Sequence, residues 1–295
     1  MEERPNKQLT IKELIGALES IGLKDGDIVY LSTQLYGIGL LKDTSSRTEY
    51  LEGIYSALID VIGSNGTIVV PTFTQQVGRF GLSFELEKTE SLTGIFGEYI
   101  RTRTESFRSL HPVFSVSAIG PAAKEICTNI SPVAFGAESS FDRLVKSGSK
   151  AVCMGFDYYS GHIVSLMHLV ETAFAVPYYY NKLVYSPVIA NGEVLKKPFV
   201  INVKYSRLNC EFNFKSYIDI LAELKAIKTA RIGRGYIHAV DAKIMFDTGV
   251  SLLKDDIFSF LTQPPTFYEG QIPFDGPPDL ESSKQHINWP GFLLV

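Results

Sequence analysis

The sequence predicts an α/β fold with a mixed sheet, because helical and strand patterns alternate along its N-terminal half. Apolar residues recur at helical spacing in residues 10–22 and 48–66. Each of these segments precedes a short apolar run typical of a buried strand, at 25–32 and 67–74. Helices that alternate with strands favour at least some parallel pairing. Residues 176–250 predict a smaller, β-rich C-terminal part.

The ends of the expected elements carry local signals. Thr10 and Glu13 form a capping-box pattern at the start of the first helix, and Gly22 predicts its end. The Asn191-Gly192 pair is typical of a hairpin turn. Further strands are expected at 114–120, 150–156, 179–189, 198–206 and 236–247, and further helices at 94–103, 121–130, 165–173 and 213–227.

The last 40 residues differ from the rest of the chain. Six of the 14 Pro fall within residues 264–290, together with several aromatic residues, so little regular structure is expected there. We therefore divide the chain into a domain of residues 1–255 and an extended Pro/aromatic-rich tail of residues 256–295 that packs on the domain or on a partner subunit.

Composition excludes several classes of protein. The chain has 295 residues, of which 45% are hydrophobic and 20% are charged, the balance of a soluble globular protein. It has no apolar run long enough for a membrane helix and no apolar signal core. A net charge of −4 without a basic run gives no support for nucleic-acid binding. Three widely spaced cysteines (Cys127, Cys153 and Cys210) suggest reduced thiols and a cytoplasmic location.

The segment "SLMHLVETA" holds the most informative polar pair. His168 and Glu171 are three residues apart, and on a helix they share one face among apolar neighbours. Such a pair suits a general base held by a carboxylate, although a core histidine bonded to a glutamate has the same spacing. A metal site is a weaker interpretation, because H-x-x-E supplies two ligands and only His162 and Asp157 are at hand to complete a set. We expect no metal.

Three other polar segments have both a structural and a functional interpretation. The turn "LSTQLYGIG" after the first strand suits either an anion site or an ordinary strand-to-helix connection. Ser45 and Arg47 lie where a helix cap is expected, and the same groups would suit a phosphate. His111 precedes Pro112, which restricts it to extended backbone at a strand entry, where a structural role is the simpler reading.

Four segments, taken together, carry a family resemblance. They are "GLKDGDIVYLSTQLYGIG", "GSNGTIVVPTFT", "RSLHPVFSVSAIGP" and "SLMHLVE". Their order and spacing over residues 9–255 resemble those of the aminoglycoside 3-N-acetyltransferase family, also called the antibiotic N-acetyltransferase family. The resemblance implies a single α/β/α domain, with helices on both faces of a mixed central sheet. It also implies acyl transfer from an acyl-CoA to an amine on a sugar.

The resemblance assigns roles to residues of this chain. It implies that His168 is the general base, that Glu171 orients the imidazole or holds the amine, and that Ser165 stabilises the oxyanion. It further implies coenzyme A contacts from the turns and the "HP" segment, at Ser32, Thr33, Gly37, Ser45, Arg47 and His111. His111 would lie near the thioester end. The partners are then small molecules, an acyl-CoA and an amino sugar, and the tail allows a homo-oligomer.

Departures from the family pattern point to a particular acceptor. Aminoglycosides are polycations, yet the segment that is often acidic in antibiotic-modifying members here contains Lys146 and Lys150. We therefore expect a nucleotide-linked amino sugar, such as a dTDP-amino-dideoxyhexose of surface polysaccharide biosynthesis. Its pyrophosphate would favour lysines, and its rings would stack on Tyr158, Tyr159 and Tyr178. The alternative is an aminoglycoside acetyltransferase that confers antibiotic resistance.

Two further classes remain as competitors. A hydrolase would use His168 with Ser165 or Cys153, but the chain has no G-x-S-x-G motif and no cysteine in a polar, basic setting. A non-catalytic binding relative is disfavoured because Ser165, His168 and Glu171 are all present.

Overall fold

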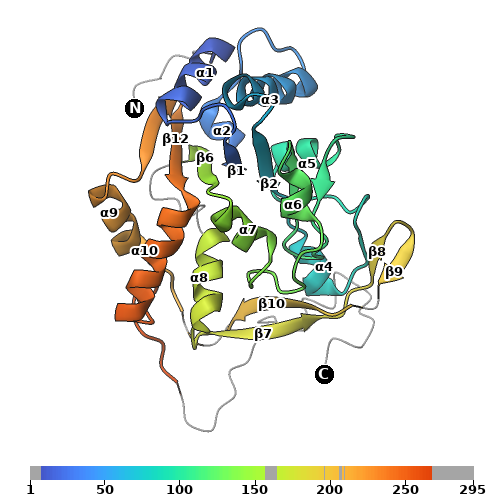
Figure 1. Cartoon of the computed structure of the whole chain (residues 1–295), viewed down its shortest axis with the longest axis vertical. Coiled ribbons are helices and arrows are strands. Elements are labelled where there is room, and N and C mark those ends of the chain that lie inside the picture. The colour runs from blue at the N-terminus through green and yellow to red at the C-terminus, as the bar shows by residue number, and fades with distance from the viewer. Residues whose placement is uncertain (1–7, 157–164, 196, 206–207, 209, 268–295) are drawn as a thin grey trace.

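The computed structural model describes residues 8–156, 165–195, 197–205, 208 and 210–267. A mixed sheet forms the centre of the molecule (Figure 1). Within the described residues this sheet has seven strands, in the order β11 (Lys228–Ile232), β12 (Gly235–Asp241), β6 (Lys150–Phe156), β1 (Ile28–Thr33), β2 (Thr67–Pro71), β5 (Val116–Ile119) and β4 (Phe107–Arg108).

The middle of the sheet is parallel. Strand β1 pairs in parallel with both β2 and β6, and the outer strands pair antiparallel. The predicted α/β class with partly parallel pairing is therefore confirmed. Side chains alternate between the two faces of β1, so that Val29 and Leu31 enter one core cluster and Tyr30 enters the other.

One face of the sheet is covered by α1 (Ile11–Ser20), α3 (Arg47–Ile62) and α5 (Ile95–Arg101). The predicted capping box is present, because the Thr10 hydroxyl accepts from Glu13 N at 3.1 Å and the Glu13 carboxylate accepts from Thr10 N at 2.9 Å. Ser46 caps α3 by its side chain, because its hydroxyl accepts from Glu49 N at 3.1 Å.

The opposite face is covered by five further helices of the described residues. These are α6 (Ala123–Cys127), α7 (Ser140–Lys146), α8 (Met167–Phe174), α9 (Lys215–Glu223) and α10 (Ala242–Asp255). Helix α8 packs beside α10 (Figure 1). Helices thus lie on both faces of the sheet, as the resemblance implied.

The predicted C-terminal part joins the central sheet, and one of its expected strands is shorter than predicted. Strand β12 pairs with β6 and extends the central sheet, and the strand expected over 236–247 stops at Asp241. Helix α10 begins there because the Asp241 side chain accepts from the N–H groups of Lys243 and Ile244. Residues spaced three or four apart then face the core, among them Met245, Thr248 and Leu253.

Smaller elements complete the fold. Strands β7 (Tyr179–Val184) and β10 (Phe199–Lys204) form a two-stranded sheet, and β3 (Phe84–Glu85), β8 (Val188–Ala190) and β9 (Glu193–Leu195) form a three-stranded one. The predicted hairpin turn joins β8 to β9, with φ of 52° at Asn191 and 77° at Gly192. Two short helices are α2 (Leu35–Ile38) and α4 (Gln75–Phe80).

The chain beyond α10 begins as part of the core. Phe260 is fully buried and Leu261 forms a bridge to Phe212, so the first residues of the predicted tail pack against the domain. The boundary at residue 255 stays a prediction, and residues 268–295 lie outside the described residues. In the part of the chain that the structure describes, no helix has the length and apolar character needed to cross a membrane.

Candidate active site

The predicted pair on α8 is joined by a hydrogen bond. His168 Nδ1 lies 2.7 Å from Glu171 Oε2, as expected for residues three apart on a helix. The helix forms because Met167, Leu169 and Val170 bury its apolar side. Glu171 is also fully buried, whereas 27% of the His168 side chain is exposed.

Glu171 is anchored from a second direction by the chain that follows α8. Ala175 adopts the left-handed conformation with φ of 47°, which ends the helix and returns the chain toward it. This return places the Tyr178 hydroxyl 2.9 Å from Glu171 Oε1, to which it donates. A buried carboxylate needs such donors, because burial without them is costly.

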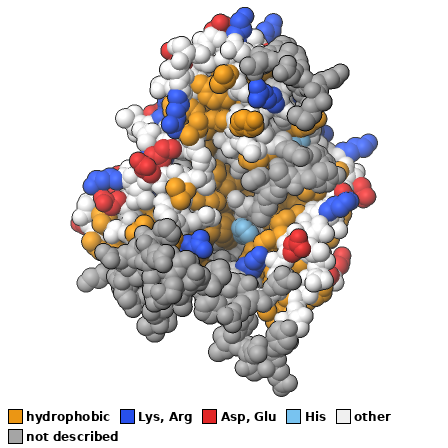
Figure 2. Space-filling model, turned by 180° about the vertical axis from the view of Figure 1, so that it is seen from behind, with side chains coloured by type: hydrophobic (Ala, Val, Ile, Leu, Met, Phe, Trp, Pro, Cys, Tyr) orange, Lys and Arg blue, Asp and Glu red, His pale blue; other side chains and the backbone are white. Residues whose placement is uncertain are grey.

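The geometry fixes the tautomer of His168. An ionised carboxylate only accepts hydrogen bonds, so Nδ1 carries the proton that points to Glu171. Nε2 then presents its lone pair, and within the described ranges no residue forms a hydrogen bond with it. Phe135 lies beside the imidazole, with ring centroids 5.2 Å apart. Figure 2 shows a histidine side chain in a hollow of the surface, next to hydrophobic side chains.

Ser165 lies at the entry to α8, next to the sheet. The Ser165 hydroxyl neighbours the phenol of Tyr30, which stands on β1. Burial raises the pKa of Tyr30, and the Ser165 hydroxyl partly offsets that rise. The arrangement brings Ser165 to the face of the sheet that α8 covers.

Ser32 and Thr33 end β1 but face opposite ways. Because side chains alternate along a strand, Ser32 shares the face of Tyr30, on the side of α8, and Thr33 points to the side of α1 and α3. The structure therefore brings Ser32 toward the face of Ser165 but does not bring Thr33 there.

Gly37 has a structural reason to be glycine. A Cβ at Gly37 would lie 1.9 Å from the carbonyl oxygen of Gly155 on β6, and Gly235 approaches Gly37 O from β12. Helix α2 thus packs directly on the sheet backbone at this point. This close contact accounts for Gly37 without a ligand.

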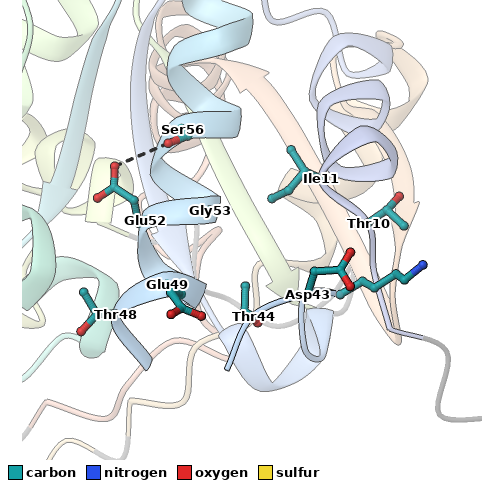
Figure 3. Close-up of a pocket in the computed structure, with 10 residues that line it drawn as sticks. Thr10, Ile11, Asp43, Thr44, Thr48, Glu49, Glu52, Gly53 and Ser56 are labelled. Carbon is teal, nitrogen blue, oxygen red and sulfur yellow. Dashed lines mark hydrogen bonds between the residues drawn. The ribbon is translucent and has the colours of Figure 1, made fainter. Parts of the chain in front are cut away.

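Ser45, one of the residues expected to contact coenzyme A, is already bonded within the chain. Ser45 N and Oγ both donate to Glu49 Oε2, at 2.7 and 2.8 Å, and these bonds lower the pKa of Glu49. Figure 3 shows the adjoining groove between α1 and α3, of about 590 Å³, with Asp43, Glu49 and Glu52 along it. These carboxylates disfavour a phosphate, although Lys42 also lines the groove. Arg47 is exposed at the first residue of α3, and its contact with coenzyme A stays a prediction.

His111 is a buried structural residue. Its ring is 1% exposed, Nδ1 accepts from Val113 N and Phe114 N at 3.2 and 3.0 Å, and Nε2 lies 3.4 Å from Val200 O. Burial lowers the pKa of His111 to about 4. With both nitrogens used by the backbone, the described geometry gives no support to a contact between His111 and coenzyme A.

The structure does not place the three tyrosines that were expected to stack on the acceptor at an open substrate site. Tyr158 and Tyr159, and also His162 and Asp157, lie outside the described residues. Tyr178 is fully buried, so its ring does not face a substrate and its hydroxyl serves Glu171 instead. Among the described residues, no cluster of three or more His, Cys, Asp or Glu side chains is arranged to hold a metal ion.

The thiol that a hydrolase would use is not poised for attack. Cys153 lies within β6, and burial raises its pKa to about 12, so that the thiol stays protonated and unreactive. Cys153 is buried, and within the described residues no hydrogen bond joins it to His168.

Two residues at the site were missed by the sequence patterns. Phe135 flanks the imidazole from a loop more than 30 positions earlier, and Tyr30 reaches Ser165 from β1. Neither has a local signature, because both look like core aromatics. The run "YYY" at Tyr178–Tyr180 was visible, but its spacing from Glu171 gave no sign of a hydrogen bond across the helix end.

Comparison with known proteins identifies the family. The model of the aminoglycoside 3-N-acetyltransferase family matches residues 41–254. The chain belongs to this family. It is an acyl-CoA-dependent N-acyltransferase, and an acyl-CoA is its co-substrate.

Relatives of this acetyltransferase family member cover most of its length. Aminoglycoside N(3)-acetyltransferase IX of Micromonospora chalcea is 23% identical, over 79% of this chain and 86% of the relative. Aminoglycoside N(3)-acetyltransferase VII of Streptomyces paromomycinus is 24% identical, over 86% and 95%. The solved structure of AAC-IIIb in a binary complex with CoASH has a TM-score of 0.70 and 20% identity, and covers 88% of this chain and 100% of that one.

The expectation of a nucleotide-linked amino sugar, and with it a role in surface polysaccharide biosynthesis, is wrong. The family model and both relatives are aminoglycoside acetyltransferases. The structure removes the argument from lysines as well. Lys146 pairs with Asp142 on α7 and with Glu138 just before that helix, each at 2.7 Å. Lys150 begins β6, at the opposite end of that strand from Gly155, and pairs with Asp27 at 2.6 Å.

Proposed function

We propose that this acetyltransferase family member moves an acetyl group from acetyl-CoA to the 3-amino group of an aminoglycoside, with His168 as the general base. The observation that carries the proposal is the geometry of His168. Its Nδ1 is held by the buried Glu171 at 2.7 Å, and its ring reaches the surface. The two curated relatives are both named for N(3)-acetylation of aminoglycosides, which supports this acceptor.

A sugar ammonium has no lone pair, so the acceptor attacks as the neutral amine, after its ammonium proton has gone to solvent. The neutral amine still needs a base, because its nitrogen becomes positively charged as it bonds to the thioester carbon. His168 Nε2 accepts the proton that the amine gives up as its nitrogen bonds to the thioester carbon. Glu171 stabilises the imidazolium that forms. As the carbon–sulfur bond breaks, His168 gives the proton to the leaving sulfur, and the products are an N-acetyl amide and CoASH.

Ser165 is the candidate donor to the oxyanion. Ser165 lies in the turn just before α8, three residues before His168, and Tyr30 neighbours its hydroxyl from the sheet. A donor aimed at the developing charge typically contributes about 2.7–4 kcal/mol of transition-state stabilisation. Ser32, on the same face of β1 as Tyr30, is the candidate contact to the thioester arm of the acyl-CoA.

The residues present fit the reactive end of an acyl-CoA better than its nucleotide end. The exposed imidazole and the Ser165 hydroxyl suit a thioester carbonyl, whereas Ser45 is occupied by Glu49 and His111 is sealed. We therefore propose His168, Ser165 and Ser32 for the thioester end. A contact between Arg47 and the phosphates of the acyl-CoA stays a prediction.

The test is release of CoASH from acetyl-CoA with a panel of acceptors. We expect turnover with aminoglycosides that carry a free 3-amino group and none with the matched 3-deamino compounds. His168→Ala should lower kcat by about 10²–10⁴-fold, the usual contribution of a general base, and leave the affinity for CoASH nearly unchanged. Mass spectrometry of the product should show one added acetyl group.

Thr229→Val is a suitable control, because Thr229 bonds to His238 on β12 rather than to the pair on α8. It should retain turnover. Turnover by His168→Ala within threefold of the wild type would exclude the base role. Absence of turnover with every aminoglycoside would exclude the acceptor.

The three buried free cysteines agree with a reducing cytoplasm, and we keep a cytoplasmic location as part of the proposal. The oligomeric state stays a prediction.

A further inference from the structure

Two phenols converge on the carboxylate that holds the base. Tyr178 donates to Glu171 Oε1 at 2.9 Å, from the turn that follows α8. The Tyr179 hydroxyl lies 3.5 Å from His168 Nδ1, on the other side of the same carboxylate, from the first residue of β7. The two rings are neighbours, with centroids 5.2 Å apart.

We propose that Tyr178, assisted by Tyr179, is a positioning residue that sets the charge and direction of Glu171 and thereby the basicity of His168. This inference rests on the proposed function, because it concerns the same base. The sequence pattern assigned Tyr178 to substrate binding, and the inference gives this residue a different role. The turn after α8 thereby becomes part of the apparatus that supports the base.

The absence of a cation gives the phenols their importance. Within the described residues, Glu171 forms an ion pair only with His168. An arginine beside Glu171 would neutralise the carboxylate and weaken its hold on the imidazolium. A phenol donates a hydrogen bond yet carries no charge, so Glu171 keeps its negative charge and a fixed orientation in a dry site.

The phenols remain donors at any working pH. Burial, followed by the nearby Glu171 carboxylate, raises the pKa of both Tyr178 and Tyr179 well above the usual range. Proton transfer from either phenol is therefore not part of the step. Their effect is electrostatic and geometric.

The other described groups around the Glu171 carboxylate bring no charge that would change its attraction to His168. Cys210 faces the two phenols, and burial raises its pKa, so it is a neutral thiol. Lys204 lies nearby but donates to the Cys210 carbonyl at 2.7 Å and sits over the Phe212 ring. Helix α10 packs on α8 through its buried face, which includes Met245 and Gly249 and carries no charge.

The chain offers a matched control for the loss of a buried hydroxyl. Tyr217 is 2% exposed and lies in the same core cluster as Tyr178, and its hydroxyl donates to the Met245 carbonyl at 3.1 Å. Tyr178→Phe and Tyr217→Phe therefore remove the same atom from the same core. Only the first removes a donor from Glu171.

The experiment measures kcat/KM against pH for the wild type and both variants. Without the Tyr178 donor, Glu171 concentrates its charge on the imidazole, and the stronger attraction to the imidazolium demands a higher pH for a free base. We expect the acid limb of Tyr178→Phe to move up by about 0.5–1 pH unit. At a pH below the limb, kcat/KM should fall about three- to tenfold, and most of this loss should disappear on the plateau.

Tyr217→Phe should keep the wild-type limb even if its thermal stability falls. A limb for Tyr178→Phe within 0.1 pH unit of the wild type would overturn the proposal. Equal shifts in the two variants would do so as well, because they would reveal a general effect of core damage. Should Tyr178→Phe fail to fold, Tyr179→Phe tests the same idea, with a smaller shift in the same direction.

A second readout does not depend on turnover. In protein labelled with ¹⁵N-histidine, the imidazole of His168 should titrate at a higher pH in Tyr178→Phe than in the wild type, and an unchanged titration would refute the positioning role. His168→Ala identifies its signals. If the wild type acetylated no aminoglycoside, the proposed function would fail while the titration still decided the role of Tyr178.

Discussion

The charge of Glu171 is open to a direct test with Glu171→Gln. The substitution keeps the size and shape of the side chain. The glutamine carbonyl can still accept from His168 Nδ1, and its amide can face the Tyr178 oxygen, which then accepts instead of donating. The tautomer of His168 is preserved, and the change removes only the negative charge.

The expected loss follows from the separation of the two groups. His168 Nδ1 and Glu171 Oε2 are 2.7 Å apart, and the centres of charge are somewhat farther. Two unit charges about 4 Å apart, at an effective dielectric constant of about 20, attract by roughly 4 kcal/mol. If the imidazole has gained about half a charge in the transition state, the loss is about 2 kcal/mol, or roughly 30-fold in kcat/KM.

The assay is the initial rate of CoASH release at several pH values, with Glu223→Gln on the exposed side of α9 as the control. The acid limb of Glu171→Gln should move to lower pH, because the imidazolium has lost a stabilising anion. That direction is opposite to the shift expected for Tyr178→Phe. A value of kcat/KM within threefold of the wild type across the plateau, or an unmoved limb, would refute the electrostatic role of Glu171.

Three predictions concern the scaffold, and chemical unfolding checks each. Gly37→Ala should lower the free energy of unfolding by about 3 kcal/mol or more, because its Cβ would meet the Gly155 carbonyl oxygen. Gly16→Ala, on the open side of α1, should instead raise the free energy of unfolding by up to about 1 kcal/mol. Equal effects of the two substitutions would contradict the packing argument. Thr10→Ala should cost about 1 kcal/mol through loss of the capping box, and no measurable cost would rule out a stabilising cap. His111 binds a proton more weakly in the folded protein, where its pKa is lowered to about 4, so the unfolded chain takes up more protons as the pH falls. The free energy of unfolding should therefore decrease by about 3 kcal/mol between about pH 6.5 and 4. His111→Asn should flatten this part of the plot of stability against pH, and an unchanged slope would be evidence against the role of His111.

Local patterns predicted the parts of the site that lie on one element. His168 and Glu171 meet because helical geometry brings residues three apart together, and that geometry needs only the apolar face of α8 to form. The hairpin at Asn191-Gly192 is similar, since both residues tolerate positive φ. Such interactions are fixed within a few residues and are visible in a sequence.

Contacts between distant elements were not predictable in the same way. Tyr178 was taken for a substrate contact because nothing in its neighbourhood reveals the turn at Ala175 that directs it to Glu171. Lys150 was assigned to an acceptor site, but the register of β6 places it at the far end of the strand, beside Asp27. In both cases the sequence indicated the chemistry of the side chain but not the groups that surround it in the fold.

The sequence by itself determined the α/β class, the helix that carries His168 and Glu171, and the family signature in its four segments, because these depend on periodicity and on the order of motifs. Only the tertiary structure decided which polar residues face the imidazole and which are sealed, paired or turned to the other side of the sheet. The reason is physical: burial, ion pairing and the direction of a side chain on a strand depend on neighbours that the chain brings from 100 or more residues away, as for Lys150 and Asp27.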